Sequence, residues 1–251
     1  MRALSQSLIS SWHFAGVLLR ADLKNTRAFV LALFQYVFIL ALIWLTTRGS
    51  RNGEIDLMVV MFPVYASLAV LFSGQAIAMR LVVWRQQGVF QRLACTPVPL
   101  GYLVLGAGLT QVIVSLIQTI GVLLFGVLVL RIPINFIGTL AAIGSLGLGA
   151  VCFTAYGTVI ASFARRAELA SMLFFFTLLP LFFLDGGLPE GILPPFVKVI
   201  SPWLPTTQLA ELTGPLMRSG TLPDTVAFPV LVLLTYTLVF AVITVKTFRW
   251  E

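Results

Sequence analysis

The chain has 251 residues, of which 59% are apolar and only 10% are charged. A soluble domain carries about 25% charged residues, so this chain has too few to cover a water-facing surface. The composition therefore indicates an integral membrane protein and excludes secreted disulfide scaffolds, disordered tails and nucleic-acid-binding domains. The net charge of +7 comes from basic residues spread thinly between apolar runs, which form no basic face for nucleic acid.

Six apolar runs without Asp, Glu, Lys or Arg predict an all-α polytopic protein with six transmembrane helices, because a helix crosses the hydrocarbon with roughly 20 residues. The third and fourth runs are longer than one crossing needs, which predicts tilt or extension beyond the bilayer. The fifth run is short. The runs are residues 28–47, 57–79, 102–130, 132–164, 169–184 and 225–245.

The positions of the basic residues predict the orientation, because Lys and Arg are retained on the cytoplasmic side. The two ends of the chain and the loops after the second and fourth runs hold eleven of the sixteen basic residues and three of the nine acidic ones. The other loops hold five basic and six acidic residues. We expect a multi-pass protein of the inner or plasma membrane with both termini in the cytoplasm.

Residues 1–27 are predicted to form a cytoplasmic amphipathic helix along the membrane surface, before a six-helix domain at residues 28–251. A signal peptide is the alternative, but the longest apolar stretch is too short and no cleavage pattern follows. The apolar residues that recur at spacings of three and four are Leu4, Leu8, Trp12, Ala15, Leu19 and Leu23.

Residues 185–224, between the fifth and sixth runs, contain seven prolines and are too polar to span a membrane. The segment nonetheless keeps apolar pieces such as residues 196–200. Backbone that leaves helical pairing within the bilayer must be buried in protein. We therefore expect short external re-entrant or interface-lying helices before the last span, and the density of Leu, Ile, Phe and Trp disfavours a disordered loop.

The fourth run carries small residues at intervals of four, a spacing that lets two helices approach closely. Such a pattern indicates structural packing rather than a substrate site. The two series are Ala141, Ser145 and Gly149, and then Ala150, Thr154, Thr158 and Ser162.

Residues for catalysis or self-powered transport are missing. The single histidine, His13, lies in the amphipathic segment, so a Ser-His dyad has no candidate base. None of the three lysines belongs to a GxxxxGK[ST] phosphate loop. We expect no catalytic residue, metal ligand or cofactor in this chain, with ATP and Mg²⁺ on another polypeptide. The uncharged runs also argue against an ion-coupled carrier, although backbone carbonyls alone can bind Na⁺.

The cytoplasmic loop at residues 80–101 is the most informative stretch. From Trp84 to Ala94 it is predicted to form one helix of about three turns, ended by prolines. Phe90 and Leu93 would lie on one side as exposed apolar knobs, with a polar and basic rim formed by Arg85, Gln86 and Arg92. Such a helix suits docking into a groove on a soluble partner. A topology loop without a partner is the equal alternative.

Two patterns resemble the permeases of ABC-2 type transporters. R-x-x-G-x-x-x-x-L-x-x-T-P-V, from Arg85 to Val98, is similar to the coupling-helix region of that family. GGLPEGILPP followed by SPWLPTT is similar to its re-entrant segment before the last helix. With the amphipathic start, the resemblance covers essentially the whole chain. Family members usually carry glutamates near the coupling glycine, where this chain has Gln86, Gln87 and Gln91.

The resemblance implies a permease half that pairs with a second permease, identical or related, and with two ABC ATP-binding subunits, most often for export. It assigns contact with the ATPase to Arg85, Gln87, Gly88, Phe90, Arg92 and Leu93. It assigns the re-entrant segment to Gly186, Gly187, Pro189, Pro194 and Pro205.

The substrate is open at this stage. An uncharged lining with several phenylalanines near the fifth run favours an amphiphilic drug, antibiotic or lipid, although phenylalanines that face membrane lipid explain the pattern equally well. Polysaccharide export is the rival within the family, and an ion-coupled secondary carrier or a membrane scaffold is the rival outside it. The phenylalanines are Phe174, Phe175, Phe176, Phe182 and Phe183.

Overall fold

The computed structural model describes residues 2–47, 57–95, 99–184, 199–222 and 225–248, which form helices and no strand. The 3₁₀ turn η1 spans Ser201–Trp203. The helices are α1 (Arg2–Lys24), α2 (Thr26–Thr47), α3 (Leu57–Gln86), α4 (Val89–Ala94), α5 (Leu100–Leu128), α6 (Phe136–Phe163), α7 (Ala167–Leu184), α9 (Pro205–Ser219) and α10 (Ala227–Thr247).

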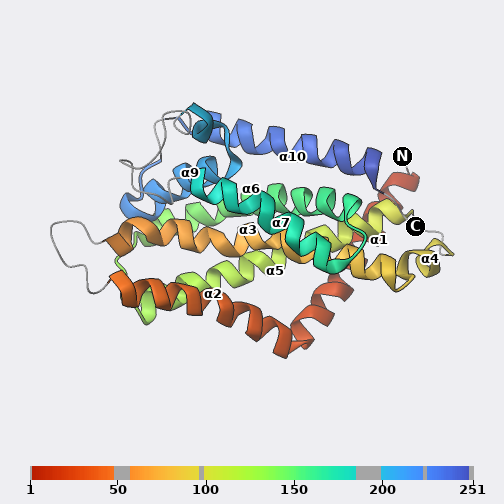
Figure 1. Cartoon of the computed structure of the whole chain (residues 1–251), viewed down its shortest axis with the longest axis horizontal. Coiled ribbons are helices and arrows are strands. Elements are labelled where there is room, and N and C mark those ends of the chain that lie inside the picture. Colours follow the sequence, from red (N-terminus) through yellow and green to blue (C-terminus); the bar gives the residue numbers. More distant parts are fainter. Residues whose placement is uncertain (1, 48–56, 96–98, 185–198, 223–224, 249–251) are drawn as a thin grey trace.

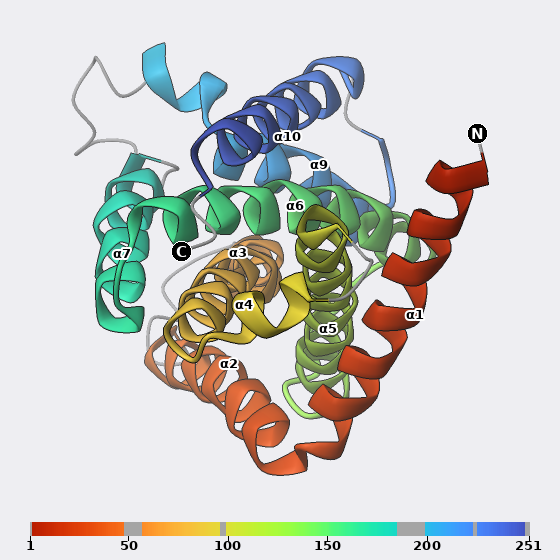
Figure 2. The same ribbon diagram turned by 90° about the vertical axis from the view of Figure 1, so that its right-hand side faces the viewer.

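Six long helices lie lengthwise in one bundle: α2, α3, α5, α6, α7 and α10 (Figure 1). The helix α3 lies at the centre, in contact with α2, α5, α6, α7 and α9. The helix α10 covers α6 and α9 on one side (Figure 2). The predicted all-helical class is therefore confirmed.

Within the part of the chain that the structure describes, four helices are long and apolar enough to cross a membrane: residues Phe62–Gln86 of α3, and α5, α6 and α10 in full. The α1–α2 pair, bent by 70°, adds a fifth if it is counted as one span, and α7 contributes a shorter apolar helix at Ala167–Leu178. The count of six spans stays a prediction. The 29 residues of α5 and the 28 of α6 reach about 40 Å, more than the hydrocarbon needs.

The bundle has two distinct ends (Figure 1). The short helix α4 lies at one end, with the last turns of α3, α6 and α10, and we call this the α4 end. The helix α9 and the turn η1 lie at the opposite end, the α9 end. Loops predicted to be cytoplasmic therefore share one end and the predicted external segment lies at the other, although which end faces the cytoplasm stays a prediction.

The N-terminal segment is helical, as predicted, and packs against the bundle. The Thr110 hydroxyl of α5 donates to the Ala15 carbonyl at 3.2 Å. Near the end of α1, Asp22 forms an ion pair with Arg80 of α3 at 2.7 Å. The chain bends at Asn25, so α1 ends and α2 begins slightly before the predicted boundary. These contacts hold α1 to the two central spans.

The helices α3 and α6 approach through glycines. A methyl group at Gly157 of α6 would overlap the backbone carbonyl of Gly74 of α3, and one at Gly74 would lie 2.5 Å from the Phe153 carbonyl oxygen. One predicted small-residue series on α6, from Ala150 to Ser162, is buried along its four positions. In the other series, Ala141 is exposed and only Gly149 is buried.

The proline-containing segment forms helices packed on the bundle at the α9 end. Pro205 is the first residue of α9, a position where its missing N–H costs no hydrogen bond. One face of α9 is buried, and the helix contacts α3, α6 and α10. Gly186, Gly187, Pro189 and Pro194 lie outside the described residues, so the re-entrant path stays a prediction.

Candidate functional site: the α4 end of the bundle

The loop that was predicted to hold a single helix contains two, because Gly88 breaks it. The helix α3 continues to Gln86, and α4 begins at Val89. Between them Gly88 has φ 67°, in the left-handed region that residues other than glycine rarely adopt. Its N–H donates to the Arg85 carbonyl at 3.1 Å. The prediction of one continuous helix from Trp84 to Ala94 is therefore wrong, and the glycine sets the direction of α4.

Phe90 lies inside the protein rather than on its surface. Its side chain is 1% exposed. The ring packs edge-on against Trp84, with centroids 6.2 Å apart, and against Phe248 at 5.9 Å. The prediction that Phe90 is an exposed knob for a partner is therefore wrong. Burial of a phenylalanine ring stabilises the fold by about 2 kcal/mol, and the turn at Gly88 makes that burial possible.

Arg85 makes contacts within the bundle that the sequence did not predict. It belongs to the last turn of α3, and its guanidinium donates to the Ala161 carbonyl at 3.1 Å and to the Ala164 carbonyl. These are the terminal carbonyls of α6, where the helix dipole favours a cation. Gln86 donates in the same way to the Arg165 carbonyl at 3.3 Å. Both side chains therefore join α3 to the end of α6.

The exposed surface of the α4 segment is polar. Gln87, Gln91 and Arg92 are exposed, whereas Leu93 is half-buried. The Arg92 guanidinium donates to the Gln87 carbonyl at 2.8 Å and to the Gly88 carbonyl at 3.4 Å, so it fixes the turn as well as facing outward. Of the six residues predicted to contact an ATPase, the accessible ones are thus at the turn and along one face of α4.

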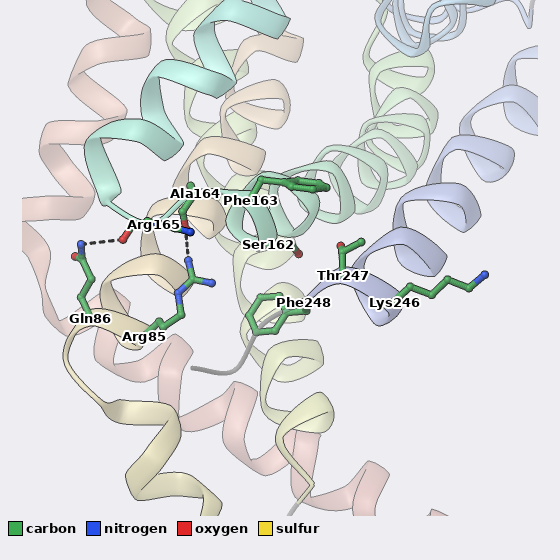
Figure 3. Close-up of a pocket in the computed structure, with 9 residues that line it drawn as sticks. All are labelled: Arg85, Gln86, Ser162, Phe163, Ala164, Arg165, Lys246, Thr247 and Phe248. Atoms are coloured by element: carbon green, nitrogen blue, oxygen red, sulfur yellow. Dashed lines mark hydrogen bonds between the residues drawn. The ribbon is translucent and has the colours of Figure 1, made fainter.

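A basic pocket of about 910 Å³ lies at the α4 end, where α3, α6 and α10 finish. Arg85, Arg165 and Lys246 supply its charges, and its nine lining residues include no carboxylate (Figure 3). Lys246 extends from the last turn of α10 (Figure 3). The pocket was not predicted, because its cations come from three segments far apart in the sequence.

An apolar groove of about 620 Å³ runs between α5, α6 and α10, and Phe248 lines both it and the basic pocket. Residues that define the groove include Tyr102, Gly108, Thr154, Ala155, Thr244 and Phe248. One signal in the sequence pointed to the groove, namely the small residues on the second half of α6. The sequence did not show which helices would face them. Among the described residues, no group of His, Cys, Asp and Glu could hold a metal ion.

Comparison with known proteins shows to which family the chain is related. The family model described as ABC-2 type transporter matches residues 17–213, which is most of the chain. No curated protein matches the chain. The matched region includes the loop at residues 80–101, the helices α2 to α7 and most of α9. The chain belongs to the ABC-2 type transporter family, as a membrane permease.

Proposed function

We propose that the chain is the permease subunit of an ATP-driven exporter that carries an amphiphilic substrate and pairs with a second permease half. Members of this family normally work with an ATP-binding subunit. The observation that carries the proposal is the position of α4 and the turn before it, which expose Gln87, Gln91 and Arg92 at the end of the bundle. Its exposed residues are where the ATP-binding subunit would dock.

The anchoring of α4 supports a mechanical role. Phe90 inserts between Trp84, in the last turns of α3, and Phe248, directly after α10. The helix α4 also contacts α5. Close-packed aromatic rings do not compress, so a partner that pushes on the exposed face of α4 moves the ends of three long helices. In this arrangement Phe90 transmits the displacement and the polar face receives it.

The apolar interior supports an amphiphilic substrate. The described parts of α5, α6 and α10 carry no charged side chain before Lys246. On α7, Phe175 and Phe176 are exposed whereas Phe174 is buried in the core. A lining of this kind favours an apolar or amphiphilic molecule over an ion or a sugar polymer. Transport of an amphiphilic dye by proteoliposomes, compared with transport of a lipid-linked oligosaccharide, separates this proposal from polysaccharide export.

Docking is tested at the exposed glutamines, because substitution at buried Phe90 would disturb the fold itself. The double variant Gln87→Arg with Gln91→Arg adds two charges where a partner surface would be desolvated. We expect copurification of an ATP-binding subunit to fall at least tenfold and ATP-dependent transport to be lost, with unchanged protein yield. Asn25→Arg with Thr26→Arg is the matched control, because both are exposed polar residues where α1 meets α2, away from α4.

Two results would overturn the proposal. Normal copurification and transport in the glutamine double variant would make the segment a topology loop. Transport that needs a proton gradient but no ATP would place the chain among secondary carriers.

A further inference from the structure

We propose that the apolar groove and the basic pocket together bind one anionic phospholipid, with its acyl chains in the groove and its phosphate at the pocket. The site rests on three features of the described residues: the chemistry of the groove walls, the charge of the pocket, and the side chain that the two cavities share.

The groove is apolar even though four threonines line it, because their hydroxyls form hydrogen bonds within the protein. The Thr158 hydroxyl bonds the Thr244 hydroxyl at 2.8 Å and joins α6 to α10. The Thr154 hydroxyl lies 3.3 Å from that of Ser73, and the Thr237 hydroxyl donates to the Leu233 carbonyl at 2.8 Å. These pairings satisfy the hydroxyls without a ligand, so hydrocarbon can occupy the groove without leaving them unpaired.

Small residues keep the groove open. A methyl group at Gly101 of α5 would meet nothing within 4 Å, and one at Gly108 would only touch the Thr154 methyl at 3.5 Å. The walls belong to three helices that are each long and apolar enough to span a membrane. Within a bilayer such a space is filled by hydrocarbon, because water would find no partners there.

The basic pocket supplies the charge that an anionic headgroup requires. Arg165 and Lys246 line the pocket and are exposed, and Lys246 extends outward from the end of α10 (Figure 3). Arg85 lies deeper and also holds the terminal carbonyls of α6. Long basic side chains near helix ends reach the headgroup region while their stems stay in apolar surroundings. The described residues that line the pocket include three cations and no carboxylate, which favours phosphate over a zwitterionic headgroup.

The two cavities adjoin at the end of α10. Phe248 lines both, Val245 lines the groove, and Lys246 and Thr247 line the pocket. A molecule with an apolar body in the groove therefore has its polar end beside the cations. This order, apolar along the span and basic at its end, matches a phospholipid. It does not match a soluble anion, which has no apolar part that would occupy the groove.

A second copy of the chain is disfavoured as the occupant. A two-fold contact would place the same basic residues of both copies at one interface, and like charges there oppose association. The groove is also concave, so a copy would need a protruding apolar ridge to fill it. A phospholipid is therefore the proposed occupant of the groove.

The test is native mass spectrometry of the purified full chain with dioleoylphosphatidylglycerol and dioleoylphosphatidylcholine, which differ only in the headgroup. We expect the anionic lipid to bind more tightly. Near a membrane surface each basic residue contributes about 1 kcal/mol, or about fivefold. Arg165→Gln with Lys246→Gln should therefore weaken the anionic lipid about 30-fold and leave the zwitterionic lipid unchanged. Arg20→Gln with Lys24→Gln, at two exposed positions of α1, is the charge-matched control.

The groove is tested by Ala155→Leu, which fills it and should abolish binding of both lipids. Ala141→Leu is the control, because Ala141 is exposed on the same helix and does not line the groove. Gly101→Leu is a second filling variant at a position with open space around it, in case Ala155→Leu elutes as aggregate in size-exclusion chromatography.

Three outcomes would overturn the proposal: equal binding of the two lipids, unchanged binding in both filling variants, or displacement by glycerol 3-phosphate at the same concentration as the lipid, which would indicate a site for soluble anions. A dimer that dissociates when the groove is filled would instead identify a second copy as the occupant.

Discussion

The helix α6 uses small residues in two opposite ways. On the side facing α3, Gly157 and Gly74 bring the two backbones into contact, and no space remains for even a methyl group. On the side facing α5 and α10, Thr154, Ala155 and Thr158 line an open groove. Small residues therefore permit close approach between helices, but they produce it only where the partner helix is also small at the crossing point.

The difference has a consequence for what fills each space. Between α3 and α6 the backbones of the two helices fill the space. In the groove nothing lies within 4 Å of a methyl group placed on Gly101 of α5, so hydrocarbon from the surroundings can enter. A series of glycine-to-alanine variants measures this difference directly, because each variant adds the same methyl group to a different environment.

The largest effect is expected for Gly157→Ala. Its methyl group would overlap the Gly74 carbonyl, and it would also lie 2.6 Å from the Ile77 Cγ2 atom. Backbone cannot rotate away as a side chain can, so α3 and α6 must separate, at a cost of about 3 kcal/mol. We expect a large fall in monodisperse protein and in thermal stability in detergent. Gly144→Ala on the same helix is the control, because nothing lies within 4 Å of its methyl group; equal losses in both variants would contradict the contact.

A smaller loss is expected for Gly121→Ala on α5. The methyl group would lie 2.8 Å from the Leu33 Cδ1 atom of α2. This neighbour is the flexible end of a side chain, so a rotamer change relieves most of the overlap and the cost is about 1 kcal/mol. Thermal unfolding of the purified protein measures it. If Leu33→Ala does not restore the stability of the Gly121→Ala variant, the proposed overlap is not the cause.

The smallest effect, and one of opposite sign, is expected for Gly108→Ala. Its methyl group would stand 3.5 Å from the Thr154 Cγ2 atom, an ordinary contact. Alanine also loses less conformational freedom than glycine in a helix, so the variant should gain about 0.5 kcal/mol in thermal stability. A loss as large as that of Gly157→Ala would show that α5 and α6 are as tightly packed as α3 and α6, and would remove the groove.

The long helices were predictable because their signal is local. An uncharged run of the required length specifies a helix wherever the surroundings are hydrocarbon, and the runs at residues 102–130 and 132–164 correspond to α5 and α6. The amphipathic start of the chain was recognised from its own periodicity. These inferences needed no knowledge of which helix lies beside which.

The α4 end shows where local reasoning stops. The pattern around Phe90 indicated an apolar side chain in a cytoplasmic loop, which is equally consistent with an exposed knob and with a buried anchor. The outcome depended on Gly88, whose left-handed turn directs α4, and on Phe248, which lies 158 residues further along the chain and provides half of the surroundings of the ring. Arg85 likewise found its partners on α6.

The sequence by itself determined that this protein belongs in a membrane, where its apolar helices lie and to which family it belongs. Composition, the length of an apolar run and a short motif can all be read from residues that are neighbours in the sequence. Only the tertiary structure decided which small residues touch and which leave a space, and it alone gathered Arg85, Arg165 and Lys246 around one pocket. Both depend on which faces of separate helices meet, and a helical face acquires a partner only when the whole bundle is assembled.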